Sequence, residues 1–132
     1  MESHSEIKHD LSQCRIELLK SLAIEAKISG DWVEDAFQVY YEARQKVSLY
    51  DDTTVLDELK KSYRLVAVTN GNSDVNKTGV NHWFEFAVSA ADVGYMKPHP
   101  AIFKTVLERA NIQADEVLHI GDDSHHDVFG AS

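Results

Sequence analysis

Apolar side chains in the first third of the chain recur at steps of three and four, the spacing of one face of an α-helix. In residues 6–28 these positions are Ile7, Leu11, Cys14, Leu18 and Leu22, and Gly30 then ends the pattern. The same spacing resumes after Asp31, the predicted N-cap, at Val33, Phe37, Tyr40, Tyr41 and Val47. The pattern predicts a helical hairpin whose aromatic side chains serve packing.

Beyond residue 50 the pattern changes to short apolar runs that alternate with helical segments. A short helix is predicted at 55–59, capped by Thr53 or Thr54, and a longer one at 101–110. Continuous apolar runs suit strands buried on both faces of a parallel sheet, and they occur at 65–68, 86–88 and 117–120. This alternation predicts an α/β fold with a Rossmann-like, three-layer core.

The predicted sheet is incomplete. Open sheets of this class have about five or six strands, so three strands leave at least one edge without a partner. The chain also ends at Ser132, about two turns into the helix expected after the third strand. We therefore expect an all-helical region at 1–48 and a partial α/β core at 49–132, cut at both ends.

Composition and charge narrow the choice of partners. The 132 residues are 43% apolar and 27% charged, as in one soluble globular domain. A net charge of −9 opposes binding to nucleic acid or to an anionic membrane, whereas a local positive site still admits a small anion. With Cys14 as the single cysteine and no apolar run near ~20 residues, the sequence predicts a cytoplasmic protein without a membrane partner.

The loop at 69–73, Thr-Asn-Gly-Asn-Ser, follows the first predicted strand at the edge where open parallel sheets bind ligands. It combines a hydroxyl group, a glycine that permits close backbone approach, and a predicted helix start with free N–H groups. These features hold a phosphate without a large net charge. The alternative interpretation is an ordinary turn followed by a helix cap.

A second loop places Asp122, Asp123 and Asp127 directly after the third predicted strand. Mg²⁺ selects hard oxygen ligands and usually takes one or two protein carboxylates together with water and substrate phosphate. Asp122 and Asp127 are near enough in sequence to reach one cation. In the alternative interpretation Asp122 or Asp123 caps a helix and the other carboxylates are solvated.

Lys97 precedes Pro98, which disfavours helical conformation and places the lysine in an extended loop. Alone, it would be interpreted as a solvated surface lysine. The order of a hydroxyl, an ammonium group and paired carboxylates along one α/β unit matches the complementary parts of a phosphoryl-transfer site.

Three segments resemble the second, third and fourth signature motifs of the haloacid dehalogenase-like superfamily: 67–71 (AVTNG), 94–98 (GYMKP) and 119–123 (HIGDD) with Asp127. The resemblance covers about residues 51–131. The stretch at 84–123 is particularly similar to the bacterial branch that includes the flavin mononucleotide and riboflavin-pathway phosphatase. The resemblance implies a Mg²⁺-dependent hydrolase that acts on a small phosphorylated metabolite through an aspartyl-phosphate intermediate.

The resemblance also implies roles at the phosphate. Thr69 would bind the transferring phosphoryl group together with the backbone of Asn70 and Gly71. Lys97 would orient the nucleophile and offset charge. Residues 1–48 resemble the helical cap that closes over the substrate and selects it.

For the metal, the resemblance implies that Asp122 is a ligand of Mg²⁺. Asp127 would support the ion through its water shell or through Lys97. Asp123, at a position that varies in the family, completes the predicted metal set.

One signature motif of the family is missing. Its Asp-x-Asp, which supplies the nucleophile and a general acid/base, does not occur upstream of Thr69, and Asp51-Asp52 lacks an apolar strand before it. We therefore expect the chain to be inactive alone. Three alternatives remain: a truncated paralogue that serves as a binding or regulatory module, a haloacid dehalogenase, and a phosphoaccepting receiver domain. The three aspartates oppose the dehalogenase, whose chemistry needs no metal, and the helical hairpin opposes the receiver domain.

Overall fold

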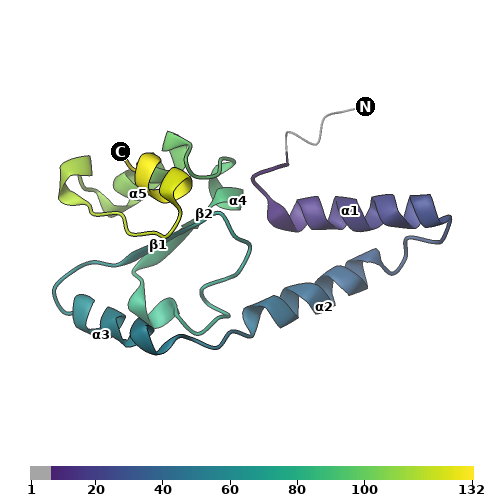
Figure 1. Cartoon of the computed structure of the whole chain (residues 1–132), viewed down its shortest axis with the longest axis horizontal. Coiled ribbons are helices and arrows are strands. Elements are labelled where there is room, and N and C mark those ends of the chain that lie inside the picture. Colours follow the sequence, from purple (N-terminus) through teal and green to yellow (C-terminus); the bar gives the residue numbers. More distant parts are fainter. Residues whose placement is uncertain (1–6) are drawn as a thin grey trace.

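The computed structural model describes residues 7–132, which form a pair of helices projecting from an α/β core (Figure 1). Helix α1 (Leu11–Ala26) begins after Asp10, whose carboxylate accepts a hydrogen bond from the N–H of Gln13 at 3.0 Å. Helix α2 (Val33–Gln45) runs back toward the core. The predicted helical hairpin is thus present within the described residues, whereas residues 1–6 of the predicted helical region lie outside them.

The limits of the hairpin differ from the prediction in two places. Trp32 occupies the N-cap of α2 without a side-chain hydrogen bond, so the prediction of Asp31 as the cap is wrong. Helix α2 ends at Gln45, so Val47 lies beyond it and is exposed. At this C-terminal end the apolar spacing continues past the point where the backbone hydrogen bonding of the helix stops.

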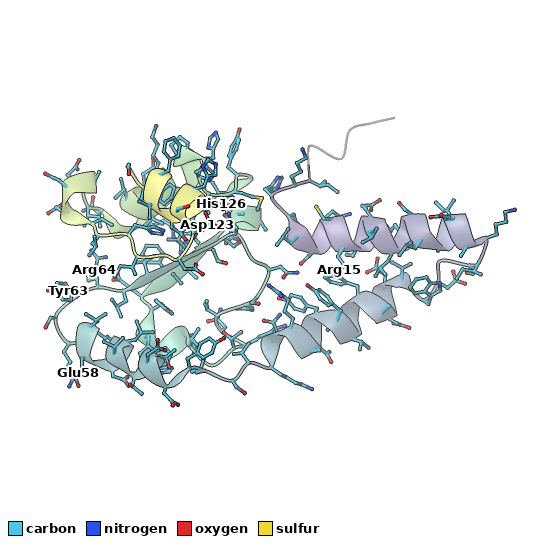
Figure 2. The ribbon with its side chains drawn as sticks, in the orientation of Figure 1. Arg15, Glu58, Tyr63, Arg64, Asp123 and His126 are labelled. Carbon is cyan, nitrogen blue, oxygen red and sulfur yellow. The ribbon has the colours of Figure 1, made fainter. Side chains whose placement is uncertain are left out.

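A narrow seam joins α1 and α2. The fully buried side chains along it are Ala23 and Val33. Phe37 packs against the rings of Tyr40 and Tyr41, and the guanidinium of Arg15 lies 4.1 Å from the centre of the Tyr40 ring, between the two helices (Figure 2). The aromatic side chains therefore pack within the hairpin, as the sequence predicts.

The core contains a parallel pair of strands, β1 (Val66–Thr69) and β2 (Phe86–Ser89). Thr69 is in register with Ser89, so both strands end at the same edge. Helix α4 (Ala90–Val93) follows β2, and α5 (Pro100–Ala110) packs across both strands. The buried cluster at this interface consists of Val88, Ala90, Ile102 and Val106, and it fixes the sheet that carries the Thr69 loop.

Short helical elements surround this sheet. The predicted short helix is present as α3 (Val55–Leu59) after the 3₁₀ turn η1 (Asp51–Thr54). Thr54 occupies the N-cap of α3 as predicted, but its hydroxyl donates to the carbonyl of Asp51 and makes no capping hydrogen bond. Turn η2 (Asn81–Trp83) buries Trp83, whose indole N–H donates to Asp57 at 2.8 Å. Turn η3 (Ala114–Glu116) and the π-helix η4 (Ser124–Phe129) complete the core.

The third predicted strand, at 117–120, is not a strand in this structure. Within the described part of the chain β1 and β2 make up the whole sheet, and Leu118 and Ile120 are 83% and 77% exposed. An apolar run indicates that its side chains favour burial. A strand also needs a neighbouring strand with which its backbone N–H and C=O groups can form hydrogen bonds. No described segment supplies that neighbour here, so the prediction of three strands is wrong.

The helix predicted directly after the first strand is also absent. Residues 70–80 form a loop, in which the carboxylate of Asp74 accepts hydrogen bonds from the backbone N–H and the side-chain amide of Asn76 at 2.8 and 3.0 Å. Asp and Asn side chains compete with the helical backbone for hydrogen bonds, which favours a turn here. The Thr69 loop is therefore held by side chains and not by a helix N-terminus.

Arg64 ties the start of both strands to the end of α5 (Figure 2). Its guanidinium donates to both carboxylate oxygens of Glu85 at 2.8 Å and to the carbonyl of Ala110 at 2.9 Å. No helix among residues 7–132 combines the length and the apolar character needed to cross a membrane.

Candidate functional site

The site begins at Thr69, the last residue of β1. Its Oγ1 accepts a hydrogen bond from the N–H of Gly71 at 2.8 Å, which turns the chain sharply out of the strand. The hydroxyl hydrogen of Thr69 remains available to a ligand. A Cβ atom on Gly71 would lie 3.1 Å from Thr69 Oγ1, so glycine keeps the space beside this hydroxyl open.

Asn70 joins this turn to the loop that carries Lys97. Its Oδ1 accepts from the N–H of Lys97 at 2.7 Å, and its Nδ2 donates to the carbonyl of Lys97 at 3.0 Å. Both bonds go to the Lys97 backbone, so they fix the point from which the lysine side chain projects. The sequence predicted only a backbone role for Asn70, and this side-chain contact was missed.

The side chain of Lys97 ends at Asp127. Lys97 Nζ lies 2.5 Å from Asp127 Oδ1, and the two side chains are 12% and 6% exposed. His119 Nε2 lies 2.9 Å from the same oxygen, while the N–H of Asp123 donates to Asp127 Oδ2 at 3.2 Å. Three groups thus converge on one buried carboxylate.

This environment determines the protonation of Asp127. Burial by itself would raise its pKa, but the hydrogen bonds from His119 and Lys97 outweigh burial and hold the pKa of Asp127 well below its usual range. Gly121 is required beside it, since a Cβ there would lie 2.1 Å from Asp127 Cγ. The carboxylate is therefore charged and closely confined.

The carboxylate of Asp123 bonds to the backbone at the start of η4. Its Oδ1 accepts from the N–H groups of His125 and His126 at 2.9 and 2.7 Å, so it is the N-cap of η4 (Figure 2 labels Asp123 and His126). The backbone and side-chain hydrogen bonds of His126 lower the pKa of Asp123 to about 2. Its carboxylate is committed to this cap, as in the alternative interpretation of the sequence.

Asp122 is exposed and lies between Gly121 and Asp123, both of which contact Asp127. Among the described residues no group of three or more His, Cys, Asp and Glu side chains is arranged to hold a metal ion. The donor chemistry fits a Mg²⁺ ion bound directly by one carboxylate, that of Asp122, with water and phosphate as further ligands. Asp127, occupied by Lys97 and His119, fits a supporting position behind such a water shell.

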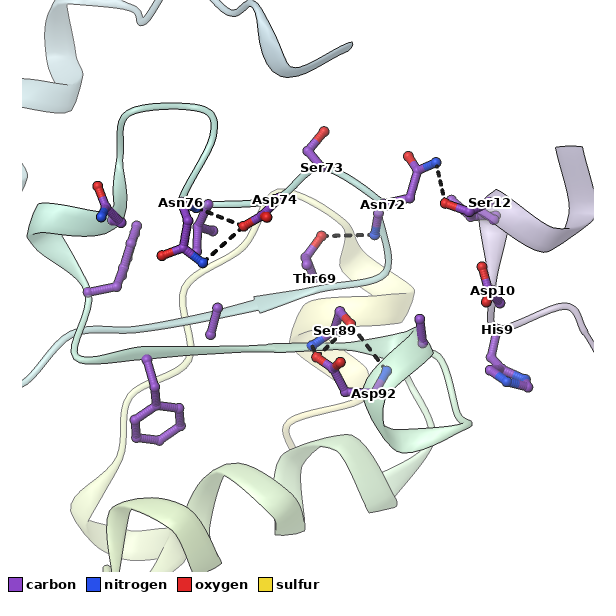
Figure 3. A pocket seen from close by; sticks show the side chains of 18 of the residues that line it. His9, Asp10, Ser12, Thr69, Asn72, Ser73, Asp74, Asn76, Ser89 and Asp92 are labelled. Carbon is purple, nitrogen blue, oxygen red and sulfur yellow. Dashed lines mark hydrogen bonds between the residues drawn. The ribbon is translucent and has the colours of Figure 1, made fainter. Parts of the chain in front are cut away.

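A cavity of about 800 Å³ opens beside the Thr69 loop (Figure 3). The start of α1 lines it with Asp10 and Ser12, and the loop lines it with Thr69 and 71–76. Asn72 Nδ2 donates to Ser12 Oγ at 3.1 Å across this junction, as Figure 3 shows. Strand β2 and the start of α4 line its other side with Phe86, Ser89 and Asp92, whereas Lys97, Asp122 and Asp127 do not line the cavity.

The structure thus connects Thr69, Asn70, Lys97 and Asp127 through direct contacts and brings Asp122 to their border. The role of His119 was missed at the sequence level. A signal existed, because His119 is the polar residue within the apolar run 117–120, where a buried imidazole needs a hydrogen-bonding partner.

The family model described as haloacid dehalogenase-like hydrolase matches residues 5–132. A similar relative is the 5-amino-6-(5-phospho-D-ribitylamino)uracil phosphatase of Escherichia coli, with 30% identity over 98% of this chain and 57% of that protein. The glyceraldehyde 3-phosphate phosphatase of Pyrococcus abyssi is 35% identical over 52% of this chain and 31% of its own length. The chain therefore spans little more than half, or less, of these curated relatives.

Among solved structures, the chain is similar to a 2-haloacid dehalogenase from Pseudomonas syringae, with a TM-score of 0.90 and 32% identity. The match covers 97% of this chain and 58% of that one. A phosphatase from Thermococcus onnurineus gives a TM-score of 0.61 at 22% identity, covering 92% of this chain and 73% of that one, which supports the fold alone.

Proposed function

The chain belongs to the haloacid dehalogenase-like hydrolases, and we propose that it carries the phosphate-holding and Mg²⁺-holding part of a phosphatase for a small phosphomonoester. The observation that carries this proposal is the line of contacts from Thr69 through Asn70 to Lys97 and Asp127. They support a site in which a hydroxyl donor, an ammonium group and a carboxylate act together. The phosphatases among the relatives support this choice within the family.

In this proposal Thr69 donates its O–H to an oxygen of the phosphoryl group, and Gly71 leaves the space into which that oxygen fits. Lys97 Nζ, oriented by Asp127, directs its remaining N–H bonds at the phosphoryl group and at the attacking carboxylate. Because Lys97 is paired with Asp127, its position is set before the substrate binds. This preorganisation is the chain's own contribution to transition-state stabilisation.

Asp122 would hold Mg²⁺, and Asp127 would support it through water. Bound there, the ion would offset negative charge on the transferring phosphoryl group. Asp123 takes no part in this proposal, because its carboxylate caps η4. Cys14 as the single cysteine suits a reducing compartment, and we propose that the enzyme acts in the cytoplasm.

We further propose that this chain alone does not turn over substrate. In the family the nucleophile is an aspartate of an Asp-x-Asp motif, and the 132 residues contain no Asp-x-Asp. The chain is expected to bind phosphate without hydrolysing its esters. The check is hydrolysis of para-nitrophenyl phosphate with Mg²⁺, and turnover abolished by Lys97→Ala or Asp122→Ala would refute the proposed inactivity.

Binding is the direct test of the phosphate site. Inorganic phosphate, titrated in the presence of Mg²⁺, is expected to shift the NMR amide signals of Thr69, Gly71 and Lys97. Lys97→Ala is expected to weaken this binding about tenfold or more, because it removes one charge-assisted hydrogen bond, which contributes about 1.5–3 kcal/mol. Lys104→Ala, which removes an exposed lysine of α5, is the matched control.

The metal arm of the test uses Mg²⁺ alone. Asp122→Ala is expected to abolish Mg²⁺-induced shifts of the Gly121 and Asp123 amides, whereas Asp115→Ala, at another exposed aspartate, leaves them unchanged. Shifts that persist unaltered in Asp122→Ala would rule out Asp122 as the ligand.

The haloacid dehalogenase is the second candidate, favoured by the similarity to the Pseudomonas syringae structure. It predicts binding of 2-chloropropionate without Mg²⁺ and no response to inorganic phosphate. The phosphate titration therefore separates the two candidates, since phosphate binding that weakens in Lys97→Ala is expected for the phosphatase alone.

A further inference from the structure

Arg44, in the last turn of α2, brings a second basic group to the Thr69 loop. Its Nη2 lies 3.7 Å from the point where a Cβ atom on residue 71 would sit, and Thr69 Oγ1 lies 3.1 Å from the same point. Since residue 71 is glycine, this point is open. A hydroxyl group and a guanidinium therefore both lie next to the space beside Gly71.

Two hydrogen bonds hold the helical pair against the loop beside this space. The buried side chain of Gln45 accepts from the N–H of Asp74 through Oε1 at 2.8 Å, and its Nε2 donates to the carbonyl of Tyr41 at 3.0 Å. On the other helix, Ser12 accepts from Asn72 at 3.1 Å. These contacts fix the end of α2 relative to the loop, so Gln45 positions its neighbour Arg44.

The two cations near the loop differ in their partners. Lys97 is already paired with Asp127 at 2.5 Å, and the pair carries no net charge. Arg44 is exposed, and within residues 7–132 it takes part in none of the ion pairs. In a chain of net charge −9, this guanidinium supplies positive charge that an incoming anion otherwise lacks.

We propose that Arg44 binds an anionic oxygen of the phosphoryl group held beside Thr69 and Gly71, and so selects phosphomonoester dianions. This inference rests on the proposed phosphatase function. A guanidinium offers a planar fork of N–H donors that matches two phosphate oxygens, which a lysine cannot reproduce. A phosphomonoester dianion presents three such oxygens. In a diester one of these three oxygens is esterified and carries no negative charge. The helical pair thereby contributes directly to the recognition of the phosphate.

The test is titration of the full chain with inorganic phosphate and, separately, with dimethyl phosphate. Arg44→Met is expected to weaken phosphate binding about tenfold and dimethyl phosphate binding less than about threefold. Arg44→Lys, which keeps the charge but loses the fork, is expected to recover part of the affinity. Lys46→Met makes the same change of charge two positions further along and is expected to alter phosphate binding less than about twofold.

Two further readouts exclude a merely structural role. Phosphate is expected to shift the NMR signal of the Arg44 Nε–H group, and the thermal midpoint of Arg44→Met is expected to match that of Lys46→Met. Gln45→Met, which keeps the volume but removes the acceptor, is expected to weaken phosphate binding about threefold. Wild-type phosphate affinity in Arg44→Met, or no shift at Nε–H, would overturn this inference alone. Absence of phosphate binding by the wild-type chain would overturn the proposed function together with it.

Discussion

The side chain of Asn70 and the backbone of Lys97 exchange two hydrogen bonds, although the residues are 27 positions apart. Asn70 belongs to the turn after β1, and Lys97 to the loop between α4 and α5. Because one amide serves both the N–H and the carbonyl of Lys97, the two loops hold a fixed relative position. The backbone of Lys97 is therefore anchored to the turn that follows Thr69.

Removing this amide is expected to loosen Lys97. Asn70→Ala deletes two hydrogen bonds to partly buried backbone groups, and we expect it to lower the free energy of unfolding by about 1–3 kcal/mol. Asn70→Asp keeps the acceptor for the Lys97 N–H but loses the donor, and we expect an intermediate loss. Urea unfolding measures both changes. Asn81→Ala, at an exposed asparagine, is the control and is expected to stay within about 0.5 kcal/mol of wild type.

The buried carboxylate of Asp127 is expected to be the most sensitive polar group in the core. Asp127→Asn leaves the ammonium of Lys97 buried without a counter-charge, which typically costs about 3–5 kcal/mol. Lys97→Met is expected to cost less, because Asp127 keeps His119 and the N–H of Asp123. Denaturant midpoints of the two variants decide the order, and an equal or larger loss in Lys97→Met would contradict it.

Two glycines are expected to respond to alanine for different reasons. A Cβ at Gly121 would overlap Asp127, so Gly121→Ala is expected to cost about 1–3 kcal/mol through overpacking and to displace the carboxylate from Lys97. Gly79 has open space around it but a φ of +83°, so Gly79→Ala is expected to cost about 1–2 kcal/mol through backbone strain.

NMR distinguishes the two causes, since Gly121→Ala alone is expected to shift the ring signals of His119 beside Asp127. Unchanged His119 signals in Gly121→Ala would show that the site accommodates the added methyl group without moving Asp127.

The ion pair of Arg64 and Glu85 is expected to make stability depend on pH in the acid range. The hydrogen bond from Arg64 lowers the pKa of Glu85 in the folded chain. A lowered folded-state pKa stabilises the fold above the unfolded pKa of glutamate, about 4.3, and this contribution disappears as the pH falls through the folded-state value. Glu85→Gln is thus expected to melt below wild type at pH 7 and to approach it by pH 3.

Thermal melts from pH 7 to pH 3 measure this convergence. Arg64→Met removes the same ion pair together with the hydrogen bond to the Ala110 carbonyl, so its difference from wild type is expected to shrink over the same interval without disappearing. A difference between Glu85→Gln and wild type that stays constant across this range would show that the ion pair does not contribute.

Local patterns were sufficient for much of the fold. The spacing of Leu11, Leu18 and Val33 predicted the helical hairpin, and the apolar runs at 65–68 and 86–88 predicted both strands of the sheet. These elements depend mainly on side chains within a few residues, so their signal is contained in short stretches. The fold class was confirmed by the similarity to solved structures of this family.

The prediction of the third strand failed because its outcome depends on distant groups. The run at 117–120 has the polarity of a strand but finds no backbone partner among the described residues. The lack of a partner is not visible in the apolar pattern. Residue type indicates what a group favours, and the available partners decide which option it takes.

The sequence by itself determined the chemical inventory: the hydroxyl of Thr69, the ammonium of Lys97, the carboxylates at 122, 123 and 127, and the order in which they occur. Tertiary structure alone decided that Asn70 holds Lys97, that His119 and Lys97 share Asp127, and that Arg44 lies beside Gly71. The reason is physical. A hydrogen bond or ion pair depends on distances of a few ångströms between residues remote in sequence, and only the packing of the helices against the sheet sets those distances.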